Sequence, residues 1–248
     1  AGADGFVLDV KAGKGAFMKT EEDAVALAKT MVQIGTLAKR STVALVTDMN
    51  QPLGRGIGNS LEVKEAILTL HGEGSENLTE LCLQLAVEMI LMAGVTTSIS
   101  EARRMLEEQL SSKKALSKFA EFVEAQGGNP KVVDDLSLLP QARYTADILA
   151  PRTGWVQDID PLAIGVTAME LGAGRETKDS IIDLAVGLEL KTQVGQQVQE
   201  GSVLATVYAN DQTRLAQAVS SGGAAIRIGQ ERVSARPLIY RKITAKDV

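Results

Sequence analysis

The sequence predicts an α/β protein: part of a domain with a mixed or parallel sheet flanked by helices, followed by a mainly β module. Two apolar runs, GFVLDV at 5–10 and TVALVTD at 42–48, flank a long helical pattern, which is typical of a parallel βαβ unit. Later in the chain, short β-like runs alternate with turns. We therefore expect a partial central α/β domain over residues 1–144 and a C-terminal module over residues 145–248.

The first elements follow from local signals. Thr20, with Asp23 three residues later, predicts the start of a helix over about 21–39, whose apolar residues recur at spacings of three and four. A Gly-rich loop at 50–59 follows the second apolar run, and LEVKEAILTL then predicts another helix. In open α/β sheets ligands bind outside the carboxyl ends of the strands, so the loops after Asp9 and Asp48 are the first places to look for function.

The remaining elements follow in order. Apolar periodicity predicts three helices, at 77–94, 98–112 and about 115–126. GGNP ends the last of them, because Gly terminates helices well and Pro cannot continue one. The C-terminal strands are expected in YTADILA, GWVQDI, VGLELK and VLATVYA, with helices at 161–171 and about 211–220.

Composition narrows the class of function. A net charge of −5 and only 4 Phe, 3 Tyr and 1 Trp argue against nucleic-acid binding. One cysteine, Cys82, cannot form an internal disulfide, and one histidine, His71, cannot supply a multi-histidine metal site, so we expect a cytoplasmic protein. The most apolar stretch, 78–95, is interrupted at helical spacing by Glu80, Gln84 and Glu88, which predicts a half-buried helix and no membrane partner. The chain begins directly in strand-like sequence, as if cut from a longer protein.

The loop GRGIGN at 54–59 allows three interpretations. It lacks the full patterns of known phosphate-binding loops, although it opens a helix whose N-terminus would attract an anion. We favour a second interpretation over phosphate binding, in which the loop is a tight turn that needs a positive φ. In the third interpretation its carbonyl oxygens, together with Glu65, bind a hard cation such as K⁺ or Ca²⁺.

Other polar residues are ambiguous. Lys11 and Lys14 lie in a Gly-containing loop that is either a phosphate site or a solvated basic loop, and Phe17 either walls a pocket or belongs to the core. Asp9 and Asp48 either face one another across the crevice or, as we favour, cap the turns that follow.

Cys82 and His71 are less ambiguous. Cys82 is expected in the core and His71 at a helix end.

The stretch VGQQVQEGSVLATVYA resembles the hammerhead half of biotinyl and lipoyl carrier domains. The carrier function would require a lysine at a hairpin tip, and neither Lys191 nor Lys242 lies in such a setting. We expect the fold to resemble a carrier domain without its chemistry.

Several motifs together resemble the second half of the pyrimidine-nucleoside and thymidine phosphorylases. They are DVKAGKGAFM, DMNQPLGRGIGNSLEVKEAI, LTELCLQLA, EARRMLEE, AQGGNPKVVDD and LGAGRETKDSIIDLAVG, in this order along the chain. The resemblance implies a homodimeric transferase of nucleoside salvage that cleaves a pyrimidine nucleoside with phosphate as co-substrate, releasing the base and a pentose 1-phosphate. A strict thymidine phosphorylase and a non-catalytic binding or assembly module are the alternatives.

The same resemblance implies roles for four residues. Phe17 matches a wall of the base pocket. Leu53 and Gly56, through their carbonyls, and Glu65, through its carboxylate, match the positions that bind a structural K⁺ or Ca²⁺. The family's phosphate loop and its base-contacting Arg, Ser and Lys have no counterpart in these residues, so we expect no catalytic residue here and no activity without an N-terminal half.

Overall fold

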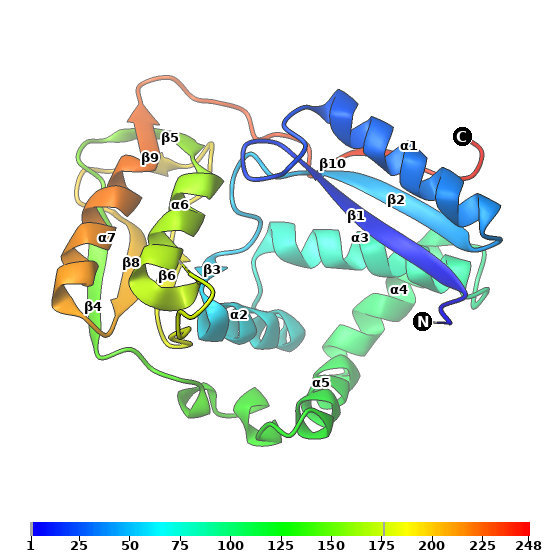
Figure 1. Cartoon of the computed structure of the whole chain (residues 1–248), viewed down its shortest axis with the longest axis horizontal. Helices are drawn as coiled ribbons and strands as arrows, with labels where there is room; N and C mark the ends of the chain where they lie inside the picture. The colour runs from blue at the N-terminus through cyan, green and yellow to red at the C-terminus, as the bar shows by residue number, and fades with distance from the viewer. Residues whose placement is uncertain (1, 176) are drawn as a thin grey trace. The chain divides into compact units, whose positions relative to one another are not determined.

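The protein is described by a computed structural model covering residues 2–175 and 177–248 (Figure 1). Its residues group into two compact units, and each unit combines segments that are distant in the sequence. Unit 1 is made of Ala1–Leu53, Glu76–Lys114 and Arg236–Val248, and unit 2 of Gly54–Ser75 and Ala115–Ala235. The sequence predicts a boundary between two consecutive modules after residue 144, and this boundary stays a prediction.

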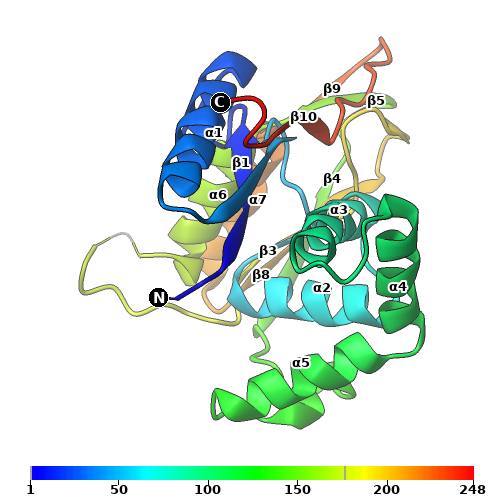
Figure 2. The same cartoon turned by 90° about the vertical axis from the view of Figure 1, so that its right-hand side faces the viewer.

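Unit 1 contains the expected parallel βαβ unit. Strands β1 (Gly5–Ala12) and β2 (Ser41–Asp48) pair in parallel, and α1 (Glu21–Leu37) connects them. The Thr20 side chain accepts a hydrogen bond from the Asp23 N–H, which caps α1 as the sequence predicts. Figure 2 shows α1 lying along the two strands.

A third strand makes this sheet mixed. Strand β10 (Ile239–Ile243) pairs antiparallel with β2, which is therefore the central strand of the order β1-β2-β10. The unit also contains α3 (Glu76–Met92) and α4 (Ile99–Ser111). Small side chains let α1 pack closely on the sheet, and the core consists of Val10, Ala12, Ala24, Ala28, Val32, Ala44, Val46 and Ile243.

Unit 2 contains two antiparallel sheets, so its second half is mainly β, as expected. The first sheet has the order β3 (Gly56–Ile57), β6 (Gly187–Leu190), β8 (Val203–Ala209) and β4 (Tyr144–Leu149), and the second has the order β7 (Gln197–Val198), β5 (Gly154–Ile159) and β9 (Ile226–Gly229). Two helices, α6 (Pro161–Ala168) and α7 (Gln212–Ala224), complete it, and α6 runs into a π-helical turn, η3 (Met169–Ala173). Leu188, Val156 and Ile164 are among the fully buried residues of its core. The hammerhead resemblance stays a prediction.

The pairing of β3 with β6 brings two backbones unusually close. A Cβ atom on Gly187 would lie 2.1 Å from the Ile57 carbonyl oxygen, and one on Gly58 would lie 2.4 Å from the Val186 carbonyl oxygen. Both glycines also have a positive φ, 152° and 142°. Glycine is therefore required at both positions.

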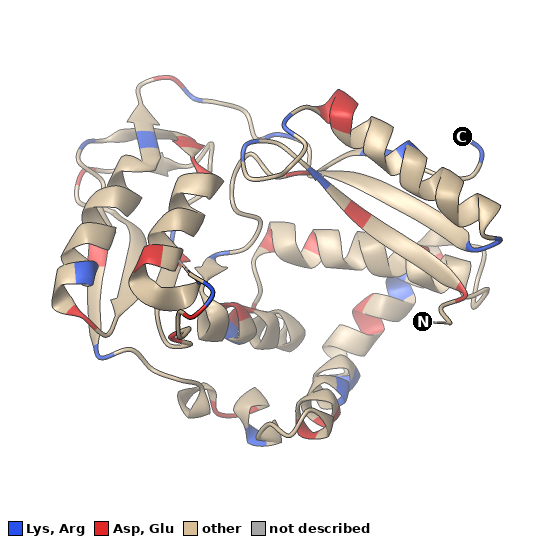
Figure 3. Cartoon of the chain, viewed as in Figure 1, with Lys and Arg blue, Asp and Glu red and all other residues tan. Residues whose placement is uncertain are grey.

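The helices of unit 2 form a smaller core. α2 (Asn59–His71) packs with α5 (Lys114–Ala125) and with two short 3₁₀ turns, η1 (Pro130–Val133) and η2 (Leu136–Leu138). Ile67 is its most deeply buried residue. Among the described residues, no helix is both long and apolar enough to cross a membrane. Acidic and basic residues are interspersed along both units (Figure 3).

Candidate functional site

The carboxyl ends of β1 and β2 lie side by side in unit 1, and their following loops are joined by backbone hydrogen bonds. The Met49 N–H donates to the Ala12 carbonyl at 2.8 Å, and the Gly15 N–H donates to the Met49 carbonyl at 2.9 Å. The loop after β1 also closes on itself, because the Gly13 N–H donates to the Met18 carbonyl at 3.0 Å. The two loops therefore form one hydrogen-bonded platform at the ligand-binding edge expected of a parallel pair.

Phe17 lies on this platform and is 97% exposed. An aromatic side chain of this size is usually covered in a folded protein. The alternative that Phe17 belongs to the core is therefore wrong, and the ring is free to contact a ligand.

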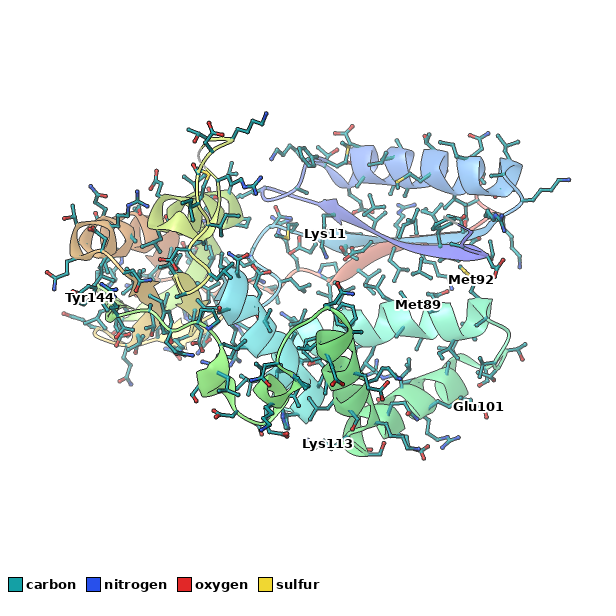
Figure 4. All side chains as sticks on the ribbon, turned by 60° about the horizontal axis from the view of Figure 1, so that its bottom comes forward. Lys11, Met89, Met92, Glu101, Lys113 and Tyr144 are labelled. Carbon is teal, nitrogen blue, oxygen red and sulfur yellow. The ribbon has the colours of Figure 1, made fainter. Side chains whose placement is uncertain are left out.

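Lys11 projects from the face of β1 on which α3 packs (Figure 4). Asp9 lies two residues earlier on the strand and therefore on the same face. The Lys11 Nζ donates to Asp9 Oδ2 at 2.6 Å and to Thr47 Oγ1 at 3.1 Å, and the Thr47 hydroxyl donates to Asp9 Oδ1 at 2.5 Å. The expectation that Asp9 caps a turn is wrong, because β1 continues three residues further to Ala12. Lys11 is likewise part of the strand and is ion-paired within this triad, so it is not a loop residue.

Asp48 lies at the end of β2 and is 8% exposed. Its Oδ1 accepts hydrogen bonds from the Tyr240 hydroxyl at 2.5 Å and from the Asn50 Nδ2 at 2.7 Å. Burial, together with the Asp48 carboxylate, raises the pKa of Tyr240, although Arg236 and Asn50 act in the opposite direction. Asp9 and Asp48 each bind their own partners, so the alternative in which they form a facing pair is also wrong.

Tyr240 is a residue that the sequence reasoning missed. It comes from β10, and it is separated from Asp48 by 192 positions in the chain. The only available signal was the short strand-like pattern LIYRKI, which predicts a strand without naming its partner.

Glu65, on α2 in unit 2, faces the loop that precedes its helix. Its carboxylate accepts hydrogen bonds from the backbone N–H of Arg55, at 2.8 and 2.9 Å, and of Gly56, at 2.9 Å. The Ser75 hydroxyl donates to the same carboxylate at 3.3 Å. The Glu65 carboxylate therefore fixes the loop by binding the loop's backbone N–H groups.

The other two residues expected at the cation site lie in different settings. Gly56 belongs to β3, and a Cβ atom there would come within 2.7 Å of the Leu61 carbonyl oxygen, so alanine would require a shift of the backbone. Leu53 belongs to unit 1, whereas Gly56 and Glu65 belong to unit 2. Gly58 has the positive φ that the tight-turn interpretation of this loop predicts.

A cavity in unit 2 lies beside Glu65. Its wall combines the apolar side chains of Leu61 and Leu68 with charged and hydroxyl side chains, namely those of Arg55, Lys64, Glu65, Glu73, Ser75 and Glu189. Such a mixture of opposite charges suits a small, hydrated ligand better than an apolar one. No cluster of three or more His, Cys, Asp or Glu side chains suited to a metal ion occurs among the residues that the structure describes.

Glu189, on β6, is the centre of a charged network. Its carboxylate accepts hydrogen bonds from Lys191 at 2.5 Å, from the Tyr208 hydroxyl at 3.0 Å and from Lys64 at 3.5 Å. Burial acts to raise the pKa of Glu189, but these donors outweigh it and lower the pKa. Burial and the neighbouring carboxylate raise the pKa of Tyr208 to about 12. Lys191 is thus engaged in this network.

The structure confirms the expected position of His71 but not that of Cys82. His71 is the last residue of α2, as expected, and its Nε2 lies 2.8 Å from the Val133 carbonyl oxygen. Cys82 is exposed on α3, so the expectation that it lies in the core is wrong.

Comparison with known proteins covers both parts of the chain. Residues 1–116 match the family described as glycosyl transferase family, a/b domain, and residues 155–229 match the pyrimidine nucleoside phosphorylase C-terminal domain. Three similar relatives are each named pyrimidine-nucleoside phosphorylase.

The relative from Bacillus subtilis (strain 168) is 55% identical over 210 residues, which is 85% of this chain and 48% of the relative. That from Geobacillus stearothermophilus is 51% identical over 244 residues, 98% of this chain and 56% of the relative. The relative from Staphylococcus aureus (strain USA300) is 50% identical over 212 residues, which is 86% of this chain and 49% of the relative. The chain spans about half the length of these relatives. The two family matches agree with these relatives, and the chain is similar to about half of a pyrimidine-nucleoside phosphorylase.

Proposed function

We propose that this chain forms part of an enzyme that phosphorolyses pyrimidine nucleosides. The observation that carries the proposal is the identity of 50 to 55% with relatives named for that activity, over 85 to 98% of the chain. In the reaction the bond between the sugar C1′ and the base nitrogen breaks, and a bond between C1′ and a phosphate oxygen forms. The bonding electrons leave with the base, which takes up a proton.

The physical problem in this reaction is a sugar with cationic character held between two anions, the leaving base and phosphate. The part of this chain in that task is to shape the base pocket. Phe17 is the proposed wall, because its ring is exposed on a platform at the carboxyl ends of two parallel strands. A flat aromatic face can stack on a pyrimidine ring without selecting its substituents, which suits acceptance of uridine, deoxyuridine and thymidine.

The alternative to this broad substrate range is that of a strict thymidine phosphorylase. The names of the similar relatives favour the broader range. Relative rates of base release from uridine and thymidine distinguish the two.

The first experiment is a chimera that joins residues 1–248 to the part of the Geobacillus stearothermophilus relative that lies outside the match. We expect phosphate-dependent release of uracil from uridine, followed by chromatography. Phe17→Ala should raise the KM for the nucleoside about tenfold, as expected for the loss of about 1.4 kcal/mol of binding. Phe122→Ala is the matched control, because Phe122 is also an exposed phenylalanine, on α5.

Two outcomes would count against the proposal. A folded chimera with no phosphorolysis would favour the alternative of a binding or assembly module. An unchanged KM in Phe17→Ala would remove Phe17 from the pocket. The chain alone lacks the motifs that the resemblance assigns to phosphate and base binding, so we expect purified residues 1–248 to release no uracil.

We further propose that Leu53 and Gly56, through their carbonyls, and Glu65 bind a structural K⁺ or Ca²⁺. The donor set fits such an ion in kind, because all three groups offer hard oxygens. Glu65 already accepts N–H groups of the same loop, and the long contact from Ser75, at 3.3 Å, is the one a cation would replace. A bound cation would neutralise the carboxylate and gather the loop carbonyls around it.

Three residues supply fewer than the 6–8 oxygens that Ca²⁺ takes, so further ligands are required. The test is the melting temperature of the chimera in KCl or CaCl₂ against the same ionic strength of tetramethylammonium chloride. Glu65→Gln should abolish the cation-dependent rise, and Glu62→Gln, on the same helix, should retain it. A rise that survives Glu65→Gln would exclude this site.

We propose that the enzyme acts as a homodimer in the cytoplasm. The support is the family resemblance, together with the single cysteine, which suits a reducing compartment. Light scattering on the chimera measures the oligomeric state, and a monomeric, active chimera would contradict the dimer.

A further inference from the structure

The loops that follow β1 and β2 contact a part-buried polar cluster, which we define as Asp48, Asn50 and Tyr240. The Asp48 carboxylate is the acceptor shared by the other two side chains, at 2.5 Å from the Tyr240 hydroxyl and 2.7 Å from the Asn50 amide. The Asn50 Nδ2 also lies 3.4 Å from the Tyr240 hydroxyl oxygen. All three residues belong to unit 1.

Asn50 transmits the position of this cluster to both loops. Its Oδ1 accepts a long hydrogen bond from the Lys14 N–H, at 3.4 Å. Its side chain also packs directly on Gly13, where a Cβ atom would come within 2.7 Å of the Asn50 Nδ2. Gly13 has a φ of 130°, so the loop after β1 starts from a conformation that only glycine adopts readily. Any displacement of Asn50 must therefore move this loop.

The Tyr240 hydroxyl is the member of the cluster that comes from a distant part of the sequence, 192 positions from Asp48. The aromatic ring packs against the core between α1 and the sheet, so it needs no hydroxyl for its own burial. The Asp48 N–H donates to the Leu238 carbonyl at 3.0 Å, which brings the start of β10 to the same point. The hydroxyl thus adds a charge-assisted bond that orients a buried carboxylate.

We propose that Tyr240 is a positioning residue for the base pocket: through Asp48 and Asn50 it sets the loop that carries Phe17. The inference rests on the proposed function. Tyr240 touches no reacting group in this scheme. It reduces the number of positions that the Phe17 loop samples, and so it lowers the conformational cost of binding the nucleoside.

The kinetic signature follows from this role. A contact to the base that is equally strong before and in the transition state affects KM and leaves kcat unchanged. In the chimera, Tyr240→Phe should therefore raise the KM for uridine about fivefold, with kcat and the KM for phosphate changed less than about twofold. Tyr144→Phe is the matched control, because Tyr144 is a part-exposed tyrosine on β4 (Figure 4) and its hydroxyl has no hydrogen bond among those recorded for the described residues. A merely structural role of Tyr240 would lower the amount of active enzyme and leave KM unchanged.

A double-mutant cycle tests whether Tyr240 acts through Phe17. In a Phe17→Ala background, Tyr240→Phe should change the KM for uridine less than about twofold, because the group that it positions is gone. A KM unaffected by Tyr240→Phe in the wild-type background would overturn the proposal, as would a full fivefold effect in the absence of the Phe17 ring.

Hydrogen exchange separates this inference from the proposed function, because it needs no activity. On residues 1–248, Tyr240→Phe should speed exchange of the Gly15 and Met49 N–H groups several-fold, and Tyr144→Phe should not. If the wild-type chimera is inactive, the proposed function fails, and the exchange of these two groups still decides whether Tyr240 orders the loops. Unchanged exchange would overturn that ordering.

Discussion

Each compact unit places a tyrosine hydroxyl against a carboxylate, and the two pairs have different surroundings. In unit 2 the Glu189 carboxylate also binds two lysines, Lys64 on α2 and Lys191 directly after β6. In unit 1 the Asp48 carboxylate binds no ammonium group among the contacts recorded for the described residues, and its other donor is the Asn50 amide.

The difference shows that the same pair of groups has two uses. The Glu189 network joins elements that backbone pairing already holds, because Glu189 and Thr206 are register partners in β6 and β8. The Asp48 cluster joins two irregular loops to the start of β10, where single backbone hydrogen bonds replace a regular strand ladder. Removing a donor should therefore lower stability in unit 2 and loosen loops in unit 1.

The largest expected effect tests whether the units are independently cooperative. Leu188→Ala empties part of the unit 2 core and should lower the free energy of unfolding by about 3 kcal/mol, within the range for buried leucines. Urea denaturation measures this loss. Hydrogen exchange should quicken in β6 and β8 while β1 and β2 keep their protection, and uniform acceleration would show that the two units unfold together. Val46→Ala gives the reciprocal variant in unit 1.

A second prediction compares the two tyrosines directly. Tyr240→Phe and Tyr208→Phe should each lower the free energy of unfolding by about 1.5 kcal/mol, the scale of a hydrogen bond to a charged group. Only Tyr240→Phe should also change loop exchange, since the partners of Tyr208 lie on strands and a helix. Equal loop exchange in both variants would remove the distinction between the two pairs.

A third prediction uses the ionisation of Tyr208. Its pKa is raised to about 12 by burial and Glu189, so the neutral phenol is the form that the folded state favours. The resulting stabilisation is fully present below pH 10.0, the ordinary tyrosine value, and is lost as the pH rises from there towards 12. Near-ultraviolet absorbance should show a phenol step near pH 12 that disappears in Tyr208→Phe. A step that persists in this variant would assign the high pKa to another tyrosine.

The smallest effect concerns a surface network in unit 1. Arg103 binds Glu80 through two nitrogens, at 2.9 and 2.7 Å, and joins α3 to α4. The hydrogen bond from Arg103 lowers the pKa of Glu80, so this stabilisation is present above pH 4.5 and fades as the pH falls below that value.

Arg103→Met should cost less than about 1 kcal/mol, because the pair is solvent-screened. Arg104→Met removes only an exposed contact to Glu108 and serves as the control. Thermal melts at pH 7 and at pH 3 should differ less in Arg103→Met than in the wild type.

Local sequence signals predicted most elements of this fold. The β-branched run of β2, the capping pair of α1 and the GGNP stop after α5 act over a few residues, and the structure confirms each. The exact ends of the strands were harder to predict from the sequence. β1 continues to Ala12 because it remains paired with β2 up to Asp48, and this pairing is invisible in a single strand's sequence.

The site was predictable only in part for the same physical reason. The exposed loop position of Phe17 and the capture of loop amides by Glu65 involve neighbours within about ten residues. Tyr240 reaches Asp48 only after β10 has paired with β2, and the exposure of Cys82 depends on how α3 packs. Long-range pairing, which periodicity does not encode, determined both outcomes.

The position of β10 in the chain has a consequence for synthesis on the ribosome. β2 is the central strand of its sheet, yet one of its neighbours is made only after all of unit 2 has emerged. Until then the nascent chain exposes a hydrogen-bonding edge of β2 that could pair with another nascent chain. We therefore expect that slowing translation before β10 increases aggregation more than slowing it after β10.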